Sequence, residues 1–202
     1  MYLKSILFSA LLLLIGSTTE KRALDVGDTA MDFNLKNVDG AMLSLKSNKE
    51  AKGYILVFTC NTCPYSVMYE DRIIALHERY AEKGYPVFAV QPNNPEKSPG
   101  DAFDKMQERA KAKGFPFPYA LDITQEVTST YGATNTPHVY ILNKQADESF
   151  RIEYIGAIDN NSRNAKAATK RYVEITVDAL LAKTEIITTK TKAIGCTIKW
   201  AD

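Results

Sequence analysis

Two of the three cysteines of this chain stand three residues apart, in the stretch ILVFTCNTCPYSV at residues 55–67. Cys60 and Cys63 follow directly on an apolar run. A disulfide stabilises a fold most when it closes a long loop, and a Cys60–Cys63 bridge would close almost none. The spacing therefore favours redox chemistry or metal binding over a structural disulfide.

The cysteines are expected where a strand gives way to a helix. Residues 53–59 form a continuous apolar, β-rich run, Pro64 suits the first turn of a helix, and residues 65–84 keep apolar side chains near helical spacing. The N–H groups and dipole at a helix N-terminus favour the thiolate, which is the attacking form. The pattern predicts that Cys60 lies at or before this N-terminus and attacks a disulfide, and that Cys63 resolves the mixed disulfide.

A metal site is the competing interpretation of the cysteine pair. A structural zinc site needs four ligands, and the other soft ligands are Cys196, His77 and His138, without a second CxxC or an HxxxH pair. Redox chemistry is therefore favoured, and no metal or organic cofactor is implied.

The N-terminus has the layout of a secretory signal peptide. Lys4 precedes a run of eleven residues at 6–16 that is apolar apart from Ser9, and small polar residues follow. The run is shorter than the roughly 20 residues that span a bilayer. We predict a signal peptide at residues 1–19 and export to an oxidising compartment, where a cysteine pair can be oxidised.

The length and net charge of the chain limit the classes of function that remain. The chain has 202 residues, enough for one domain with extensions, and a formal net charge of +1. This balance gives no basic surplus for binding nucleic acid or an anionic membrane surface.

The rest of the chain alternates predicted strands and helices. A hairpin is expected within 23–45, where Asp39 and Gly40 make a turn. The predicted strands are 53–59, 85–91, 137–143 and 148–158, and the predicted helices are 65–84, 101–114, 124–132 and 162–182. This order predicts an α/β domain over 24–182 with a mixed central sheet flanked by helices, followed by a tail at 183–202.

Several stretches resemble the thioredoxin-like redoxin family. They are VGDTAMDFNLKNVDG, FTCNTCPYSVMYEDR, FPYALDITQEVTSTYGATNTPHVYIL and YIGAIDN, and they are most similar to the peroxiredoxin-like branch related to alkyl hydroperoxide reductase and thiol-specific antioxidant proteins. The tail segment AIGCTIKW resembles the C-terminus of the same branch. The resemblance spans about residues 24–200 and implies a thioredoxin fold and thiol–disulfide oxidoreductase activity carried by Cys60 and Cys63.

The resemblance also implies a substrate groove. Folds of this type place a cis-proline loop opposite the CxxC, and Thr136-Pro137 occupies the matching position. We expect this bond to be cis, and we expect the Thr136 backbone to pair with a bound substrate strand. The implied partners are proteins with thiols or disulfides, together with a redox partner protein.

The sequence departs from the pattern of thioredoxins at two positions. Thr59 stands where they have tryptophan before the first cysteine, and Tyr54 stands where they have a buried acid. Aromatic shielding of the site is therefore absent, and no acid is evident to remove the proton of the resolving thiol.

Peroxide reduction is the second interpretation, and a non-catalytic binding module is the third. Peroxiredoxins carry Thr or Ser three residues before the reactive cysteine, whereas this chain has Val57 before Cys60 and Cys60 before Cys63. Disulfide exchange is therefore preferred to peroxide reduction, and the CxxC itself argues against the binding module.

Two further residues are auxiliary candidates. His138 follows Pro137 and could tune the sulfurs, although an exposed position is favoured for it. Cys196 is either a buried, inert thiol in a docked tail, which is favoured, or a third redox cysteine that pairs with Cys60, with Cys63 or with a second chain.

Overall fold

The apolar run before the cysteines forms the central strand of the sheet. The computed structural model describes residues 22–202, so the predicted signal peptide at 1–19 lies outside the described residues. Strand β3 (Gly53–Phe58) is buried at every residue. Because side chains alternate along a strand, Ile55 and Val57 enter one hydrophobic core, whereas Leu56 and Phe58 enter the other. β3 thus lies between two cores and anchors the cysteines that follow it in the sequence.

The sheet is mixed, as predicted. Its seven strands lie in the order β2-β1-β5-β4-β3-β7-β8, and the parallel pairs are β3 with β4 and β4 with β5. The strands are β1 (Leu35–Asn37), β2 (Met42–Leu43), β4 (Val87–Gln91), β5 (Tyr119–Leu121), β7 (His138–Lys144) and β8 (Phe150–Gly156). The predicted N-terminal hairpin is the antiparallel pair of β1 and β2.

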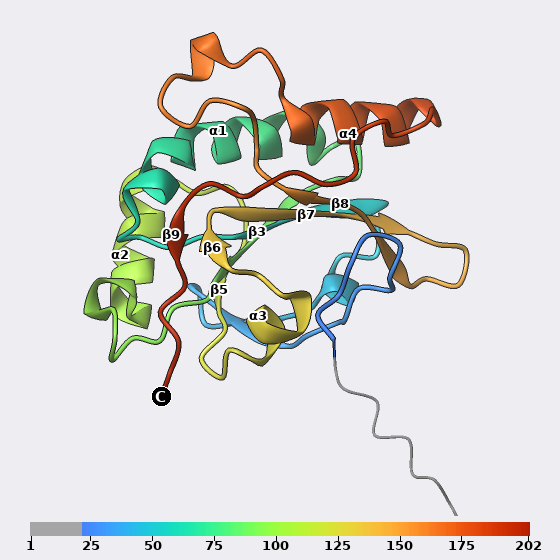
Figure 1. The fold of residues 1–202 in the computed structure, drawn as a ribbon. Helices are drawn as coiled ribbons and strands as arrows, with labels where there is room; N and C mark the ends of the chain where they lie inside the picture. Colours follow the sequence, from blue (N-terminus) through green and yellow to red (C-terminus); the bar gives the residue numbers. More distant parts are fainter. Residues whose placement is uncertain (1–21) are drawn as a thin grey trace, which may run out of the picture.

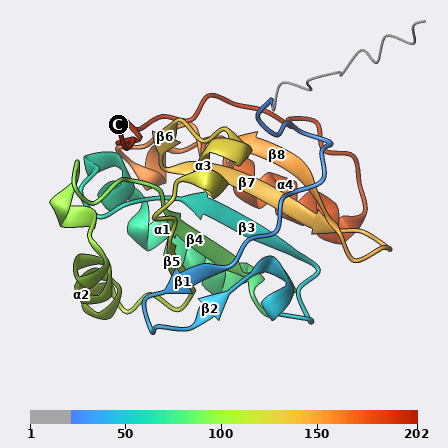
Figure 2. The ribbon, with the colours of Figure 1, turned by 90° about the horizontal axis from the view of Figure 1, so that it is seen from below.

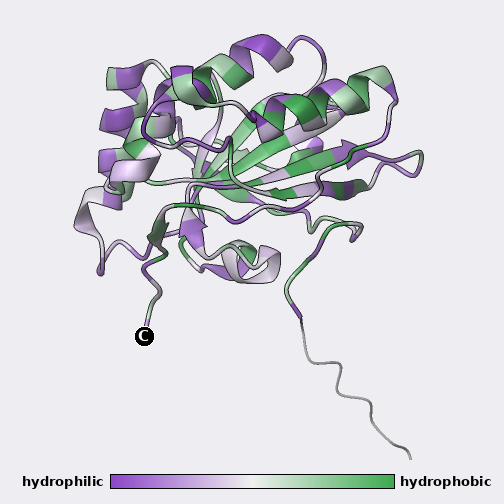
Figure 3. Cartoon of the chain, turned by 45° about the horizontal axis from the view of Figure 1, so that its top comes forward, coloured by the Kyte–Doolittle hydropathy of each residue, from purple (hydrophilic) through white to green (hydrophobic). Residues whose placement is uncertain are grey.

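Helices cover both faces of this sheet (Figures 1 and 2). Helices α1 (Pro64–Tyr80), α2 (Phe103–Lys113) and α4 (Tyr172–Ala182) contribute to the core on one face, and the short helix α3 (Glu126–Tyr131) contributes to the core on the other. Figure 3 shows the strands as the most hydrophobic part of the chain, with polar residues gathered on the outer sides of the helices. This two-sided burial explains the continuous apolar sequence of the central strands.

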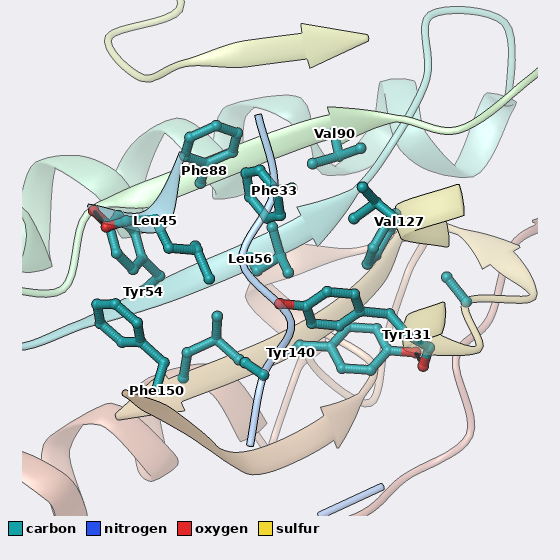
Figure 4. Packing of buried hydrophobic residues seen from close by; sticks show 14 of the residues in the cluster. Phe33, Leu45, Tyr54, Leu56, Phe88, Val90, Val127, Tyr131, Tyr140 and Phe150 are labelled. Carbon is teal, nitrogen blue, oxygen red and sulfur yellow. Dashed lines mark hydrogen bonds between the residues drawn. The ribbon is translucent and has the colours of Figure 1, made fainter. Parts of the chain in front are cut away.

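Aromatic side chains fill the core on the α3 face (Figure 4). Tyr131 of α3 packs edge-on against Tyr140 of β7, with ring centroids 5.3 Å apart. Phe58, at the end of β3, packs against both rings. The end of the central strand, two residues before Cys60, is therefore held by large rigid side chains.

The C-terminal tail returns to the sheet and ends beside the cysteines. After α4, Ile155 N donates to Thr189 O at 3.0 Å, which ties the tail to β8. Further on, β9 (Cys196–Thr197) pairs antiparallel with β6 (Asn135–Thr136), so that Cys196 lies opposite Thr136. Figure 1 shows this pair of strands at one end of the molecule.

The predicted helix at 162–182 is wrong in its first half, since α4 begins at Tyr172. The Asn164 side chain accepts the N–H groups of Lys166 and Ala167, and the Asn160 side chain accepts those of Thr169 and Lys170. Asparagine side chains offer the backbone an alternative to helical hydrogen bonds, so this stretch forms turns and one 3₁₀ segment at Ala165–Ala167.

Within residues 22–202, no helix is both long and apolar enough to cross a membrane.

Candidate active site

Cys63, and not Cys60, lies at the helix N-terminus. Helix α1 begins at Pro64, and Cys63 is its N-cap residue. Pro64 occupies the first turn, and the residue before it is therefore the cap. The prediction that Cys60 lies at or before the helix N-terminus is confirmed, since Cys60 lies before it. Cys60 lies three residues earlier, in the turn between β3 and α1.

The environment of Cys63 favours its thiolate. The Cys60 thiol lowers the pKa of Cys63, and burial opposes this shift; hydrogen bonds from the Cys196 thiol and from the backbone N–H groups of Ser66 and Cys196 lower the pKa further. The Ser66 N–H belongs to the first turn of α1, where free donors and the helix dipole stabilise an anion.

The environment of Cys60 favours its thiol. The neighbouring Cys63 sulfur, burial and the charge of Asp101 all raise the pKa of Cys60. The Cys60 sulfur lies 3.2 Å from Thr136 Oγ1 and 4.0 Å from Ser66 Oγ. The two shifts have opposite directions, so the pair loses its first proton more readily at Cys63 than at Cys60.

A buried carboxylate holds the dipeptide between the cysteines. Asp101 is fully buried, and its Oδ1 accepts the backbone N–H of Asn61 at 2.7 Å and of Thr62 at 3.1 Å. Its Oδ2 accepts hydrogen bonds from the Thr62 hydroxyl at 2.7 Å, from Ser98 at 2.6 Å and from Asn93 at 2.8 Å. Asp101 thus fixes the turn that brings the two sulfurs together.

The sequence assigned Asp101 a different role. It is the expected N-cap of the helix at 101–114, but α2 begins at Phe103 with Ala102 as its N-cap. The network joins Asp101 to residues 39 and 40 positions away, so no local pattern indicates it. An acid thus lies near the CxxC despite the Tyr54 departure, supplied by a distant loop.

The proline loop lies against the cysteines, and its peptide bond is cis as predicted. In its protonated form, Cys63 donates its thiol hydrogen to the Thr136 carbonyl oxygen at 3.1 Å. The expectation that the Thr136 backbone is free for a substrate strand is wrong, since β9 of the tail occupies this edge. Cys196 N donates to the Cys63 sulfur at 3.4 Å. Cys63 therefore interacts with Cys196 as well as with Cys60.

His138 and Thr59 have a less direct relation to the reactive cysteines. His138 is buried, which corrects the favoured expectation of an exposed side chain. Its Nδ1 accepts the Thr134 N–H at 3.4 Å, and burial lowers the pKa of His138 to about 4, so the ring is neutral near pH 7. Thr59 is buried as well, and its N–H continues the sheet by donating to Val90 O at 2.9 Å.

In the described part of the chain, no group of three or more His, Cys, Asp or Glu side chains is arranged to hold a metal ion. None of the three cysteines is in a disulfide bond. The chemistry that this arrangement supports is nucleophilic attack by a stabilised thiolate beside two further thiols.

The lowered pKa of Cys63 predicts an unusual pH profile of reactivity. A free cysteine has a pKa near 8.5. Below that value, its reaction rate rises about tenfold for each unit by which the pH increases. We expect the rate at which iodoacetamide alkylates Cys63 to be nearly independent of pH between about 6 and 8, because the thiolate is already formed. Peptide mass mapping measures this rate at Cys63.

The Cys60→Ala variant is the matched control for this profile. It removes the largest cause of the lowered pKa, so its profile should shift toward higher pH. A tenfold rise per pH unit in the unsubstituted protein would contradict the assignment of the charge to Cys63.

The contact between the tail and the proline loop depends on Gly195. A Cβ at this residue would lie 2.0 Å from the Thr136 carbonyl oxygen and 2.6 Å from its carbon. Since both atoms belong to the backbone, Gly195→Ala should push β9 away, lower the free energy of unfolding by about 1–3 kcal/mol, and increase the alkylation rate of Cys63.

Ile194→Ala is the control for Gly195→Ala, because this neighbouring side chain is 44% exposed. It should leave both the unfolding curve and the alkylation rate close to those of the unsubstituted protein. Equal alkylation rates in Gly195→Ala and Ile194→Ala would mean that β9 does not close the site.

Comparisons with known proteins agree with this site and fold. Residues 26–149 match the model of the AhpC/TSA family. The thiol-disulfide oxidoreductase ResA of Geobacillus thermodenitrificans is 29% identical over 129 residues, which is 62% of this chain and 68% of that protein.

Solved structures extend the likeness over most of the chain. An uncharacterized conserved protein from Geobacillus kaustophilus is 32% identical, with a TM-score of 0.80 over 88% of this chain and 93% of its own. A protein described as the thiol:disulfide interchange protein DsbE from Chlorobium tepidum is 20% identical, with a TM-score of 0.59 over 79% of this chain and 99% of its own, a likeness in fold alone. The expected thioredoxin-like fold is confirmed, and the chain belongs to the AhpC/TSA family.

Proposed function

We propose that this chain is a thiol–disulfide oxidoreductase in which Cys63 attacks and Cys60 completes the exchange. The observation that carries the proposal is the Cys63 sulfur at the N-terminus of α1, with a lowered pKa and with the Cys60 thiol beside it. Membership of the AhpC/TSA family and the likeness to ResA proteins support the same reaction class.

The reaction runs in two exchange steps. The Cys63 thiolate attacks one sulfur of a substrate disulfide, which forms a mixed disulfide and releases the other substrate sulfur as a thiolate. Cys60 then loses its proton and attacks the Cys63 sulfur, which forms the Cys60–Cys63 disulfide and releases the second substrate thiol. The substrate gains two electrons, and the reverse sequence oxidises a dithiol.

The first step itself activates the second cysteine. The Cys63 sulfur is the largest cause of the raised pKa of Cys60. Once Cys63 is in a mixed disulfide, its negative charge is gone, so Cys60 ionises more easily. The Thr136 hydroxyl, 3.2 Å from the Cys60 sulfur, favours the resulting thiolate.

The substrates in this proposal are proteins with thiols or disulfides, and a second thiol protein supplies or removes the electrons. The domain at 24–182 and the tail at 183–202 act together, since the tail carries Cys196 to the site. Export through a signal peptide at 1–19 would place the pair in an oxidising compartment.

Reduction of a protein disulfide is the direct test, with insulin as substrate and dithiothreitol as the electron donor. We expect catalysed insulin reduction, and we expect peroxide to be consumed more slowly than about 10⁴ M⁻¹s⁻¹, the lower end of ordinary enzymes. The absence of a hydroxyl residue three positions before either cysteine is the reason for the second expectation. Faster peroxide consumption without insulin reduction would replace the proposal with a peroxidase.

A further inference from the structure

The tail places a third thiol against the redox pair. Strand β9 sets Cys196 opposite Thr136, and Cys196 N donates to the Cys63 sulfur at 3.4 Å. A hydrogen bond between the Cys196 thiol and the Cys63 sulfur shifts the pKa values of both, as does the one between Cys60 and Cys63. The family match over residues 26–149 does not include this cysteine.

The three thiols differ in how far a partner protein can reach them. Cys60 is 4% exposed and Cys63 is 3% exposed, whereas Cys196 is only half-buried. A sulfur that is more accessible exchanges faster with the sulfur of another protein. With the tail docked, Cys196 is the cysteine of the described chain that an external thiol or disulfide meets first.

We propose that Cys196 is the third redox cysteine of this centre, and that it carries the disulfide between the buried Cys60–Cys63 pair and an external thiol protein. The proposal rests on the function proposed above and adds the route by which electrons enter or leave.

The internal step is a balanced exchange. The Cys196 thiolate attacks Cys63 in the Cys60–Cys63 disulfide, so that the Cys63–Cys196 bond forms and the Cys60–Cys63 bond breaks. Cys60 leaves with the bonding electron pair and takes up the proton that Cys196 gave up. No external oxidant is needed, because one disulfide replaces another.

The exchange between Cys196 and the external protein follows from the different pKa values of Cys63 and Cys196. An external thiolate attacks the Cys196 sulfur, forms a mixed disulfide there and releases Cys63 as a thiolate. Cys63 is the better leaving group, since its pKa is lowered whereas burial and the neighbouring Cys63 sulfur raise the pKa of Cys196 to about 11. A second thiol of the same partner then frees Cys196.

Trypsin separates the relevant cysteines, which makes the bond between them measurable. Cleavage after Lys52 and Arg72 leaves Cys60 and Cys63 on residues 53–72, and cleavage after Lys192 and Lys199 leaves Cys196 on residues 193–199. A Cys63–Cys196 disulfide joins two peptides, whereas a Cys60–Cys63 disulfide lies within one.

The first test oxidises the Cys60→Ala variant with oxidised glutathione. We expect loss of both remaining thiols and recovery of residues 53–72 joined to residues 193–199. Cys63 left with bound glutathione and an unreacted Cys196 would overturn the proposal. Chains joined through Cys196 would overturn it as well.

The matched control is Cys196→Ser, which should still form the Cys60–Cys63 disulfide. Its reduction by glutathione should be slower than that of the unsubstituted protein by about tenfold or more, because both sulfurs are buried. Equal rates would overturn the entry role of Cys196 and leave the proposed function standing. Failure of Cys196→Ser to form any disulfide would instead count against the proposed function itself.

Discussion

Substitution of Cys63 by serine is expected to lower disulfide exchange by at least about 10³-fold, because it removes the attacking sulfur. Insulin reduction measures this loss. Cys63 is the N-cap of α1 and the cysteine with the lowered pKa, so no other thiol has the same position.

Cys60→Ala is the matched variant, because it keeps the nucleophile. It should still attack a disulfide, and the mixed disulfide at Cys63 should then be resolved by Cys196. Mass mapping of the modified cysteine separates the two variants. If Cys60 carried the bound glutathione in the unsubstituted protein and Cys63→Ser kept most of the activity, the roles assigned here would be reversed.

Asp101→Asn is expected to have the largest effect on stability among substitutions near the site. The carboxylate accepts hydrogen bonds from Asn61, Thr62, Asn93 and Ser98 while fully buried. An amide can accept at only one end, so at least one buried donor loses its partner. Hydrogen bonds to charged groups contribute about 1.5–3 kcal/mol each, and we expect the free energy of unfolding to fall by about 3 kcal/mol in urea denaturation.

Asp104→Asn is the control for this substitution. Asp104 is exposed and lies in the first turn of α2, so its change should stay within about 0.5 kcal/mol. Asp101→Asn should also lower the pKa of Cys60, since the charge of Asp101 raises it. Equal unfolding curves for the two variants would show that Asp101 does not hold the CxxC turn.

The fold could be predicted because its signals are local. The continuous apolar run became β3, the turn at Asp39 and Gly40 became a hairpin, and the helix after Pro64 begins where proline is tolerated. The same proline indicates that Cys63 caps the helix. The prediction for Cys60, a position at or before the helix N-terminus, did not use this signal to place Cys63 as the cap.

The remaining features of the site depend on contacts between distant segments. Asp101 reaches the CxxC turn from a loop, and Cys196 reaches Cys63 across 133 positions of sequence. The occupied edge at Thr136 has the same origin, because a short β9 strand of two residues has no periodic pattern of its own. The sequence identified Thr136 and Cys196 as candidates but not Asp101, and it carried no information on which residues meet.

The central claim is that Cys60 and Cys63 form a reversible dithiol–disulfide couple. The most direct test equilibrates the Cys196→Ser variant in glutathione buffers of graded potential and counts its remaining thiols. The account predicts that both thiols disappear and return together, at a potential on the oxidising side of about −270 mV, since the lowered pKa of Cys63 stabilises the reduced pair. Two thiols that persist in every buffer, or that are lost without return, would contradict it.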